Sequence, residues 1–408
     1  MVYIEFFDCI PLENICSCLS AMPEKVIMIG NDKKRMGKHQ VRYQRILEGR
    51  GIETEFILFN AAKNNIQHQI EVLSSIVEKY NDCVFDLTGG EELSLVAAGI
   101  VYERYHDKKN LRLQRVNIRN NTVMDCEIDG VSEESPMPEL TLEENILLYG
   151  GDIVYASETD GIGTSVWEDS EEFFRDVDKI WEIARKNPFS WAQQIGDLAF
   201  AERHRDVYES TALTTVFKPQ AQSNTSFSID DDIMDGLKKE GLIGYINEHN
   251  VFCISYKNEQ VKKILNKEGL AMEMKIYVTA KRMYEDGNPM FHDVRNGVVI
   301  DWDGQIAKEG NTINEIDVCL MKGCMPVFIS CKSGKVDVSE LFKLNAVGEH
   351  FGGAYAKKVL MTNALPTEKG ADHFIINRAS DMGIRLIRNV HTFDDDEQIM
   401  DKLQKIFP

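Results

Sequence analysis

The sequence predicts an α/β protein built from two or three domains. Three observations favour this fold class. The 408 residues exceed one ordinary domain, and about the first 125 of them alternate short apolar runs with amphipathic helical runs. From Glu259 onwards the order of expected elements changes, so the last part is no second copy of the first. Strand–helix alternation is typical of a parallel sheet with helices on both faces.

The first domain, expected over residues 1–130, takes its strands from runs rich in Ile, Val, Phe and Leu. The expected strands are 2–7, 25–29, 55–59, 83–87, 111–118 and 122–128, the last two being joined by a hairpin at 119–121. The expected helices between the strands are 12–21, 38–50, 66–80 and 91–105.

Residues 131–258 are expected to form an acidic connector and a small winged-helix-like spacer. Between Asp129 and Asp178 stand 15 acidic residues and one basic residue, a local charge of −14 out of −20. We expect this stretch to be a solvated connector with helical pieces. Helix 230–240 carries five acidic residues and two lysines, so a structural spacer is favoured over a DNA reader. The other expected elements are helices 171–185 and 191–209 and strands 242–246 and 251–256.

The last domain, expected over residues 259–408, has a compact α/β order. It begins with one long helix, 259–284, and continues with a three-stranded meander. The remaining elements are expected at 297–302, 312–321 and 325–331 for the meander, then helix 338–350, strand 358–362, helix 371–382 and strand 384–388.

Composition excludes several classes. With 43% hydrophobic and 27% charged residues the chain can bury a core, and no apolar run approaches the roughly 20 residues of a membrane span. The first eight residues lack the pattern of a signal peptide. Nine cysteines without a Cys-x-x-Cys pair argue for reduced thiols and against a zinc site, so a cytoplasmic protein is expected.

Two strand–helix junctions of the first domain could bind phosphate, because free backbone N–H groups point at an anion there. One is Thr88-Gly89-Gly90, where glycines allow close approach and Thr88 offers a hydroxyl. The other is Gly30-Asn31, followed by Asp32 and three basic residues. The alternative is two tight turns chosen for geometry alone. No Gly-x-Gly-x-x-Gly follows the first strand, so an NAD enzyme is not expected.

At these residues the domain resembles the CRISPR-associated Rossmann fold (CARF) domains, which dimerise and sense cyclic oligoadenylates. The resemblance covers residues 1 to about 130 and implies that the loops after the first and fourth strands touch the ligand. The ligand-binding candidates are Asp8, Pro11, Gly30, Asn31, Lys33, Asn60, Thr88, Gly89 and Gly90.

The last domain carries the residues that could do chemistry. Glu315 and Asp317 lie two apart on one expected strand, and Ser330 and Lys332 lie two apart on the next. Two carboxylates and an ammonium at one end of a sheet suit metal-dependent hydrolysis of a phosphodiester, with Mg²⁺ or Mn²⁺ as the cofactor. The alternative is a salt-bridged face of an exposed strand pair.

This arrangement resembles the PD-(D/E)xK nucleases. In that resemblance Asp317 matches the metal-binding aspartate, Lys332 the motif lysine, and Glu273 the helical glutamate. Ser330 stands where these nucleases have an acid, so the metal-ligand set departs from the pattern. Glu315, or Glu340 on the following helix, could replace the missing carboxylate.

Together the two ends resemble the ancillary nucleases of type III CRISPR systems. The resemblance implies a homodimer in which cyclic tetra-adenylate binds across the sensor domains and activates metal-dependent cleavage of RNA or DNA. An alternative from another class is a ligand-responsive transcription regulator that reads DNA through the central winged helix.

Overall fold

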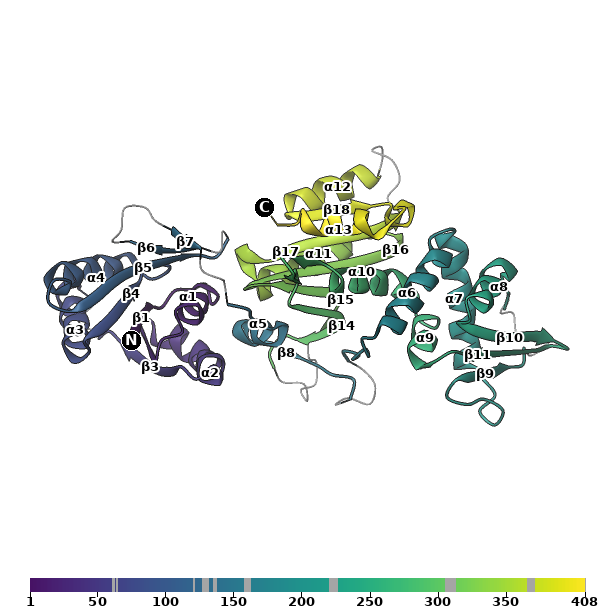
Figure 1. Cartoon of the computed structure of the whole chain (residues 1–408), viewed down its shortest axis with the longest axis horizontal. Helices are drawn as coiled ribbons and strands as arrows, with labels where there is room; N and C mark the ends of the chain where they lie inside the picture. The colour runs from purple at the N-terminus through teal and green to yellow at the C-terminus, as the bar shows by residue number, and fades with distance from the viewer. Residues whose placement is uncertain are drawn as a thin grey trace.

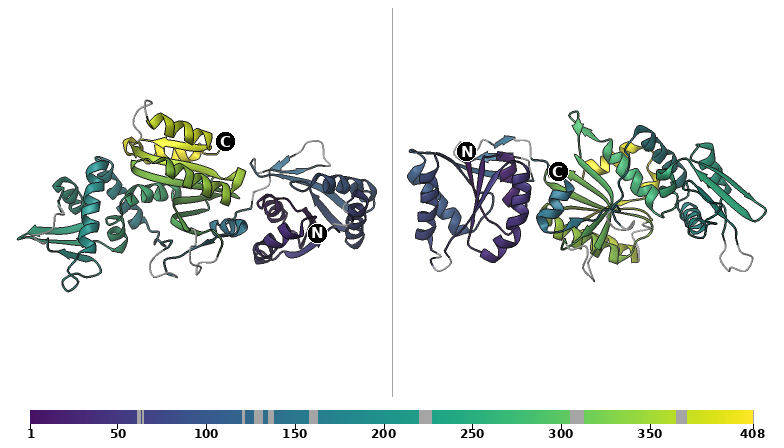
Figure 2. Two further views of the ribbon diagram at one scale, coloured as in Figure 1. Left: turned by 180° about the vertical axis from the view of Figure 1, so that it is seen from behind. Right: turned by 90° about the horizontal axis from the view of Figure 1, so that it is seen from below.

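A computed structural model describes residues 1–60, 63, 65–119, 122–126, 132–134, 138–157, 163–219, 227–304, 313–364 and 371–407. Three units follow one another along the long axis of the molecule (Figure 1). The amino-terminal unit lies at one end, the sheet of the last third lies in the middle, and the central part of the sequence lies at the other end. The views from behind and from below show the same arrangement (Figure 2).

The amino-terminal unit is a seven-stranded sheet of order β3-β2-β1-β4-β5-β6-β7, in which β1 to β5 are parallel. Helices α1 and α2 cover one face and α3 and α4 the other, which confirms the predicted doubly wound sheet. Its elements are β1 (Val2–Phe6), α1 (Glu13–Ala21), β2 (Lys25–Gly30), α2 (Lys33–Gly49), β3 (Glu53–Leu58), α3 (Ile66–Lys79), β4 (Asp82–Asp86), α4 (Glu92–Tyr105), β5 (Asn110–Asn117), β6 (Thr122–Asp125) and β7 (Ser132–Glu134).

The edge of this sheet agrees with the predicted hairpin, since β5 and β6 are antiparallel. Asn120 and Asn121 of the predicted turn, and the end of the predicted strand 122–128, lie outside the described residues. Helix α2 begins at Lys33 rather than at residue 38, because the side chain of Asp32 accepts hydrogen bonds from the backbone N–H groups of Lys34 and Arg35.

The middle of the sequence forms a three-stranded sheet of order β10-β11-β9 with helices around it. Helix α8 buries Ile233, Met234 and Leu237 and exposes its acidic residues. The second predicted helix of this unit runs from Pro188 and ends at Arg203 rather than at residue 209. The elements are α6 (Glu171–Ala184), α7 (Pro188–Arg203), β9 (Thr214–Phe217), α8 (Asp231–Lys239), β10 (Ile243–Glu248), β11 (Val251–Tyr256) and α9 (Glu259–Ile264).

The last third forms most of a six-stranded sheet of order β18-β17-β16-β15-β14-β8. Helices α10 and α13 pack on one face, and α5, α11 and α12 pack on the other. The elements are α10 (Leu270–Lys281), β12 (Tyr284–Glu285), β13 (Asn288–Pro289), β14 (Asp293–Asp301), β15 (Ile313–Lys322), β16 (Met325–Lys335), α11 (Val338–Phe351), the 3-10 helices Gly353–Tyr355 and Val390–Thr392, β17 (Lys357–Ala364), α12 (Ala371–Asp381), β18 (Ile384–Arg388) and α13 (Asp396–Gln404).

Two expectations about this sheet are wrong. The predicted long helix 259–284 is two helices, α9 and α10, separated where Gly269 has a left-handed backbone with φ of 82°. The acidic connector is in part structural, because it supplies α5 (Leu142–Tyr149) and β8 (Asp152–Ile153). Leu142 and Ile146 are buried on the sheet, and β8 pairs with β14.

None of the described helices is long and apolar enough to cross a bilayer.

Candidate functional site

The carboxyl ends of the parallel strands in the first sheet form a rim. The loop after β1 and the turn after β4 touch there, because the N–H of Gly90 donates to Oδ2 of Asp8 over 3.3 Å. Gly90 has φ of 110°, and a Cβ atom there would lie 2.5 Å from Cβ of Phe6. A Cβ atom at Gly89 would lie 2.9 Å from Cβ of Asp8. Glycine is therefore needed at both positions for the two loops to pack together.

The loop after β2 reaches the same turn through Asn31, whose Nδ2 donates to Oε2 of Glu91 over 2.6 Å. Gly30 ends β2, and Lys33 is exposed in the first turn of α2. Asn60 is exposed just after β3. The structure thus brings Asp8, Asn31 and the Gly89-Gly90 turn together, with Lys33 and Asn60 exposed on neighbouring loops.

Two of the predicted ligand-binding residues, Thr88 and Pro11, do not present their side chains to a ligand on the rim. The Thr88 hydroxyl donates to Oδ1 of Asp86 over 2.5 Å and accepts from the N–H of Val116 over 2.8 Å. Its only donor proton therefore holds the turn and is not offered to a ligand. Pro11 is buried, so its side chain is not displayed on the rim.

Two buried carboxyl groups lie beneath this rim. Glu5 on β1 and Asp86 at the end of β4 are paired across the sheet and have no exposed surface. Ser17 donates to Oε2 of Glu5 over 3.0 Å. Burial, followed by the neighbouring Asp86, raises the pKa of Glu5 well above its usual value, so the neutral form is favoured in the fold.

The second candidate site lies where β15 and β16 separate. The ladder between these strands ends at the pair Val318 and Ile329. Beyond it, Oδ2 of Asp317 accepts from the backbone N–H of Cys331 over 2.6 Å and from the hydroxyl of Ser330 over 3.2 Å. A side-chain carboxylate thus takes the place of the next ladder contact, which fixes Asp317 at the fork.

Lys332 faces the same carboxylate. Its ammonium lies 3.9 Å from Oδ2 of Asp317 and 3.1 Å from Oε2 of Glu340 on α11. Burial lowers the pKa of Lys332, but the two carboxylates outweigh burial and the pKa is raised, which keeps the lysine charged. Glu340 is also bound to Lys343 over 3.0 Å. Glu340 therefore holds the lysine in place.

Glu273 approaches from α10 on the other side. Its side chain is buried, and the pKa is raised to about 8, first by burial and then by the nearby charge of Asp317. Burial likewise raises the pKa of Asp317 against the opposing effect of Lys332. Two carboxylates that disfavour each other's charge are thus held at one place, which is typical of functional sites.

Glu315 is held by an ion pair at the edge of this site. Its Oε1 lies 2.6 Å from the ammonium of Lys267, just before α10, and its side chain is 46% exposed. On the neighbouring strand β14, Gly297 has φ of 59°. It lies between Asn296, which pairs with Val318, and Val298, which pairs with Ile316. The amide of Asn296 donates to the carbonyl oxygen of Asp317 over 2.9 Å, so β14 also positions the aspartate.

One atom of this site indicates that it fits a divalent metal. Oε2 of Glu273 is buried and has no hydrogen-bond partner among the described residues. Such an atom is costly unless a cation or donor reaches it. Mg²⁺ is often held by one or two carboxylates with water and substrate phosphates, so Glu273 and Asp317 fit. Glu315, predicted as a third ligand, is held by Lys267 instead. No group of three or more potential ligands is close enough for one metal within the described ranges.

Sequence reasoning missed Lys267 and Asn296 as members of this site. Lys267 lies in the helix break that the sequence analysis did not predict, and Asn296 lies on a strand that begins four residues earlier than expected. Burial raises the pKa of the Cys331 thiol, so this cysteine is a poor nucleophile.

No protein-family model matches the sequence, and no curated protein is similar to it. Solved structures do resemble it. Protein VC1899 from Vibrio cholerae matches with a TM-score of 0.75 and 17% identity over 100% of this chain and 97% of its own. Can2 from Sulfobacillus thermosulfidooxidans, solved in complex with cyclic tetra-adenylate, matches with a TM-score of 0.65 and 17% identity over 100% and 99%.

The chain has the fold of these two proteins. A type III CRISPR defence DNA nuclease activated by cyclic oligoadenylate shares this fold more distantly, with a TM-score of 0.53 and 11% identity over 91% of this chain and 47% of its own. At the level of fold, this agrees with the mixed α/β architecture that the resemblance to the ancillary nucleases of type III CRISPR systems implied.

Proposed function

We propose that this protein is an endonuclease of type III CRISPR defence that is activated by cyclic tetra-adenylate and requires Mg²⁺ or Mn²⁺. The observation that carries the proposal is the fork between β15 and β16. There the ammonium of Lys332 lies 3.9 Å from Asp317, and the charge of Asp317 also acts on the buried Glu273 of α10, which supports a catalytic role for these three residues. Solved proteins of the same fold include one bound to cyclic tetra-adenylate and one described as a nuclease activated by such a ligand.

In this proposal Glu273 and Asp317 hold the metal, which when bound supplies positive charge to a phosphodiester and lowers the pKa of water. The ammonium of Lys332, kept charged by two carboxylates, binds a phosphate oxygen or orients the attacking water. Ser330 and the N–H of Cys331 fix the aspartate so that little rearrangement accompanies the reaction.

Activation requires that the two ends of the chain communicate. A two-fold symmetric ligand bound between the rims of two sensor units favours one dimer geometry, and that geometry brings the two catalytic sheets to a competent spacing. The rim formed by Asp8, Asn31 and the Gly89-Gly90 turn is the ligand-binding surface in this proposal.

The test is cleavage of labelled RNA and DNA by the full chain with Mn²⁺, with and without cyclic tetra-adenylate. We expect cutting only when both are present, and a loss of about 100-fold or more in Asp317→Ala and Lys332→Ala. Lys108→Ala, which changes an exposed lysine of the sensor unit, is the control and keeps full activity. Equal cutting by Asp317→Ala and the unaltered chain would overturn the proposal.

The alternative of a DNA-reading transcription regulator is not favoured. The candidate reading helix, α8, packs its apolar side inward and shows Asp231, Asp232 and Asp235 outside, a surface that repels phosphate.

A further inference from the structure

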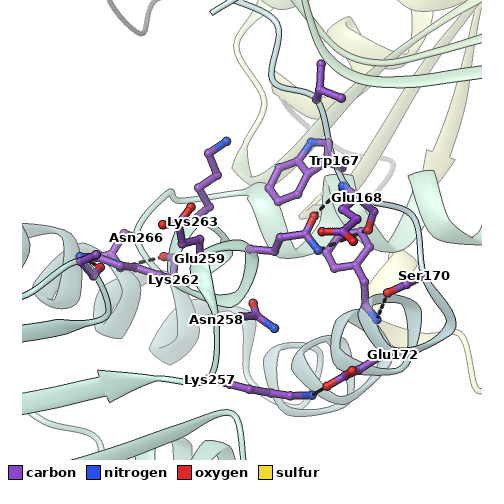
Figure 3. Close-up of a pocket in the computed structure, with 14 residues that line it drawn as sticks. Trp167, Glu168, Ser170, Glu172, Lys257, Asn258, Glu259, Lys262, Lys263 and Asn266 are labelled. Atoms are coloured by element: carbon purple, nitrogen blue, oxygen red, sulfur yellow. Dashed lines mark hydrogen bonds and ion pairs between the residues drawn. The ribbon is translucent and has the colours of Figure 1, made fainter. Parts of the chain in front are cut away.

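A cavity of 870 Å³ lies between the start of α6, the segment that precedes it, and α9. Its lining is mixed, with lysines, glutamates, side-chain amides and two aromatic rings. Figure 3 shows Trp167 and Lys263 on one side, Lys257 and Glu172 on the other, and Asn258 between them. The proposed function does not use this cavity.

The wall of the cavity is attached to the catalytic sheet. Val299 on β14 is paired with Glu315 on β15. The N–H of Val299 also donates to Oγ1 of Thr164 over 2.8 Å. Trp167 follows Thr164 by three residues and lines the cavity. Trp167 is therefore three residues from Thr164, whose hydroxyl accepts a hydrogen bond from β14. Strand β14 in turn pairs with β15, which carries Glu315 and Asp317.

A second connection leads to the same place. Asn266 lines the cavity, and its neighbour Lys267 places an ammonium 2.6 Å from Oε1 of Glu315. Lys263, also in the lining, precedes Lys267 by four residues. Two separate segments of chain thus connect the lining of the cavity to the sheet that carries Asp317, one through Thr164 to Val299 on β14 and the other through Lys267 to Glu315 on β15.

Trp167 has the properties of a stacking platform. It lies parallel to Phe173, with ring centroids 5.6 Å apart and an angle of 12°, so its orientation is fixed. The ammonium of Lys263 lies 5.2 Å from the indole centroid. An aromatic face that is fixed on one side and covered by a flexible lysine on the other can accept a flat ring once the lysine moves.

The lysines of the cavity differ in their partners. Lys257 is bound to Glu172 over 2.8 Å, and Lys262 is bound to Glu202 over 2.9 Å. Lys263 contacts the Ser165 hydroxyl over 3.4 Å and makes no ion pair with a carboxylate in the part of the chain that the structure describes. Its charge is therefore available to a phosphate.

We propose that this cavity binds one unpaired nucleobase of the strand being cut, stacked on Trp167, with Lys263 on the adjoining phosphate. The inference rests on the proposed nuclease function. A base inside a duplex has both faces covered, so a fixed indole can only stack on a base outside the helix. The side-chain amide of Asn258 can then contact the base edge.

The experiment measures binding rather than cutting. The full chain carrying Asp317→Ala is titrated, with Mn²⁺ and cyclic tetra-adenylate present, into a labelled single-stranded oligonucleotide, and anisotropy gives the dissociation constant. The same is done with oligonucleotides that lack one base at successive positions. We expect one position at which loss of the base weakens binding about 10-fold, since base–aromatic stacking has that magnitude.

Adding Trp167→Ala should weaken binding of the intact oligonucleotide about 10-fold and abolish the penalty for that missing base. Trp167→Phe, which keeps a ring on Phe173, should lose less and guards against misfolding. Tyr208→Ala, at a ring that is 96% exposed in the same unit, should change nothing.

A missing-base penalty that is unchanged by Trp167→Ala would overturn this inference while leaving cleavage by the parent chain, and so the proposed function, intact. Absence of both cutting and oligonucleotide binding in every form of the protein would overturn the two together. These two failures are therefore distinguishable.

Discussion

The carboxylate of Asp317 replaces a strand–strand contact and also faces Lys332. Because burial raises the pKa of Asp317, the metal-free fold disfavours its charge. An asparagine can still accept the hydrogen bond from Cys331. A neutral residue would therefore give a more stable fold at this position. A carboxyl group at such a position is typical of a residue that is kept for function.

The first prediction concerns Asp317→Asn. We expect the melting temperature in EDTA to rise by about 2–4 °C, as for roughly 1 kcal/mol in a domain of this size. The unaltered chain should gain stability when Mn²⁺ is added, and the variant should gain none, because one of two metal ligands is lost. Thermal scans with EDTA and with Mn²⁺ measure both. An equal Mn²⁺ effect in the two proteins would contradict the two-carboxylate site.

The second prediction concerns Glu5. Because its folded pKa lies above the unfolded value, stability is full below the ordinary glutamate pKa and is lost as pH rises toward the folded pKa. The loss is at most about 1.4 kcal/mol per pH unit. Glu5→Gln should therefore flatten the fall in stability of the sensor unit as pH increases, measured by urea unfolding across the acidic to neutral range.

Glu103→Gln, at an exposed carboxylate of α4, is the matched control and should leave the slope unchanged. If Glu5→Gln and the unaltered chain lose stability with pH at the same rate, the pKa of Glu5 is not raised in the fold.

Strands and helices of this chain are shaped by a few glycines that the hydrophobic pattern does not reveal. Gly297 on β14 lies across the ladder from Asp317 and has a left-handed backbone. A Cβ atom there would lie 3.8 Å from Oε1 of Glu315, so the space exists and the cost of a side chain is conformational.

The third prediction is that Gly297→Ala destabilises the protein by about 1–2 kcal/mol and lowers cleavage, because the strand facing Asp317 shifts. Gly99→Ala, inside α4 with open space around it, should instead stabilise by up to about 1 kcal/mol. Denaturant unfolding of both variants makes the comparison. A Gly297→Ala variant as stable as the unaltered chain would show that the left-handed backbone at Gly297 does not require glycine.

Helices and strands are predicted well from the sequence where the hydrophobic pattern is strong, and poorly where that pattern is interrupted. The parallel strands of the sensor unit and the meander 293–335 are found close to their expected places. The break at Gly269 was missed because apolar residues continue on both sides of it. The packing of helix α5 on the sheet was missed because its acidic composition hid Leu142 and Ile146, which the sheet buries.

Across the whole molecule, the proposed sensor unit and the proposed catalytic unit are joined by direct contacts. The hydroxyl of Tyr355, after α11, donates to Oε1 of Glu13 on α1 over 2.6 Å. The same carboxyl group lies near the rim, since a Cβ atom at Gly89 would be 3.7 Å from its Oε2. Glu13 thus contacts the catalytic unit and borders the proposed ligand surface, which is the position of a coupling residue.

The fourth prediction is that Tyr355→Phe leaves the affinity for cyclic tetra-adenylate unchanged but lowers the ratio of activated to basal cleavage about 2- to 10-fold, the range expected for one hydrogen bond. Calorimetry and cleavage assays measure the two quantities. Tyr105→Phe removes a similar 2.6 Å bond, to Glu78, within the sensor unit alone and should leave the ratio unchanged. Equal ratios in all three proteins would exclude this coupling.

The sequence by itself determined the doubly wound amino-terminal sheet and the strand pair that carries Asp317 and Lys332, because periodicity fixes which residues share a face. Only the tertiary structure decided that Glu315 pairs with Lys267, that Thr88 turns inward to Asp86, and that Trp167 stacks on Phe173 in the wall of a cavity. Those outcomes depend on contacts between residues tens of positions or more apart in the chain or on the rotation of single side chains, and a local pattern contains neither.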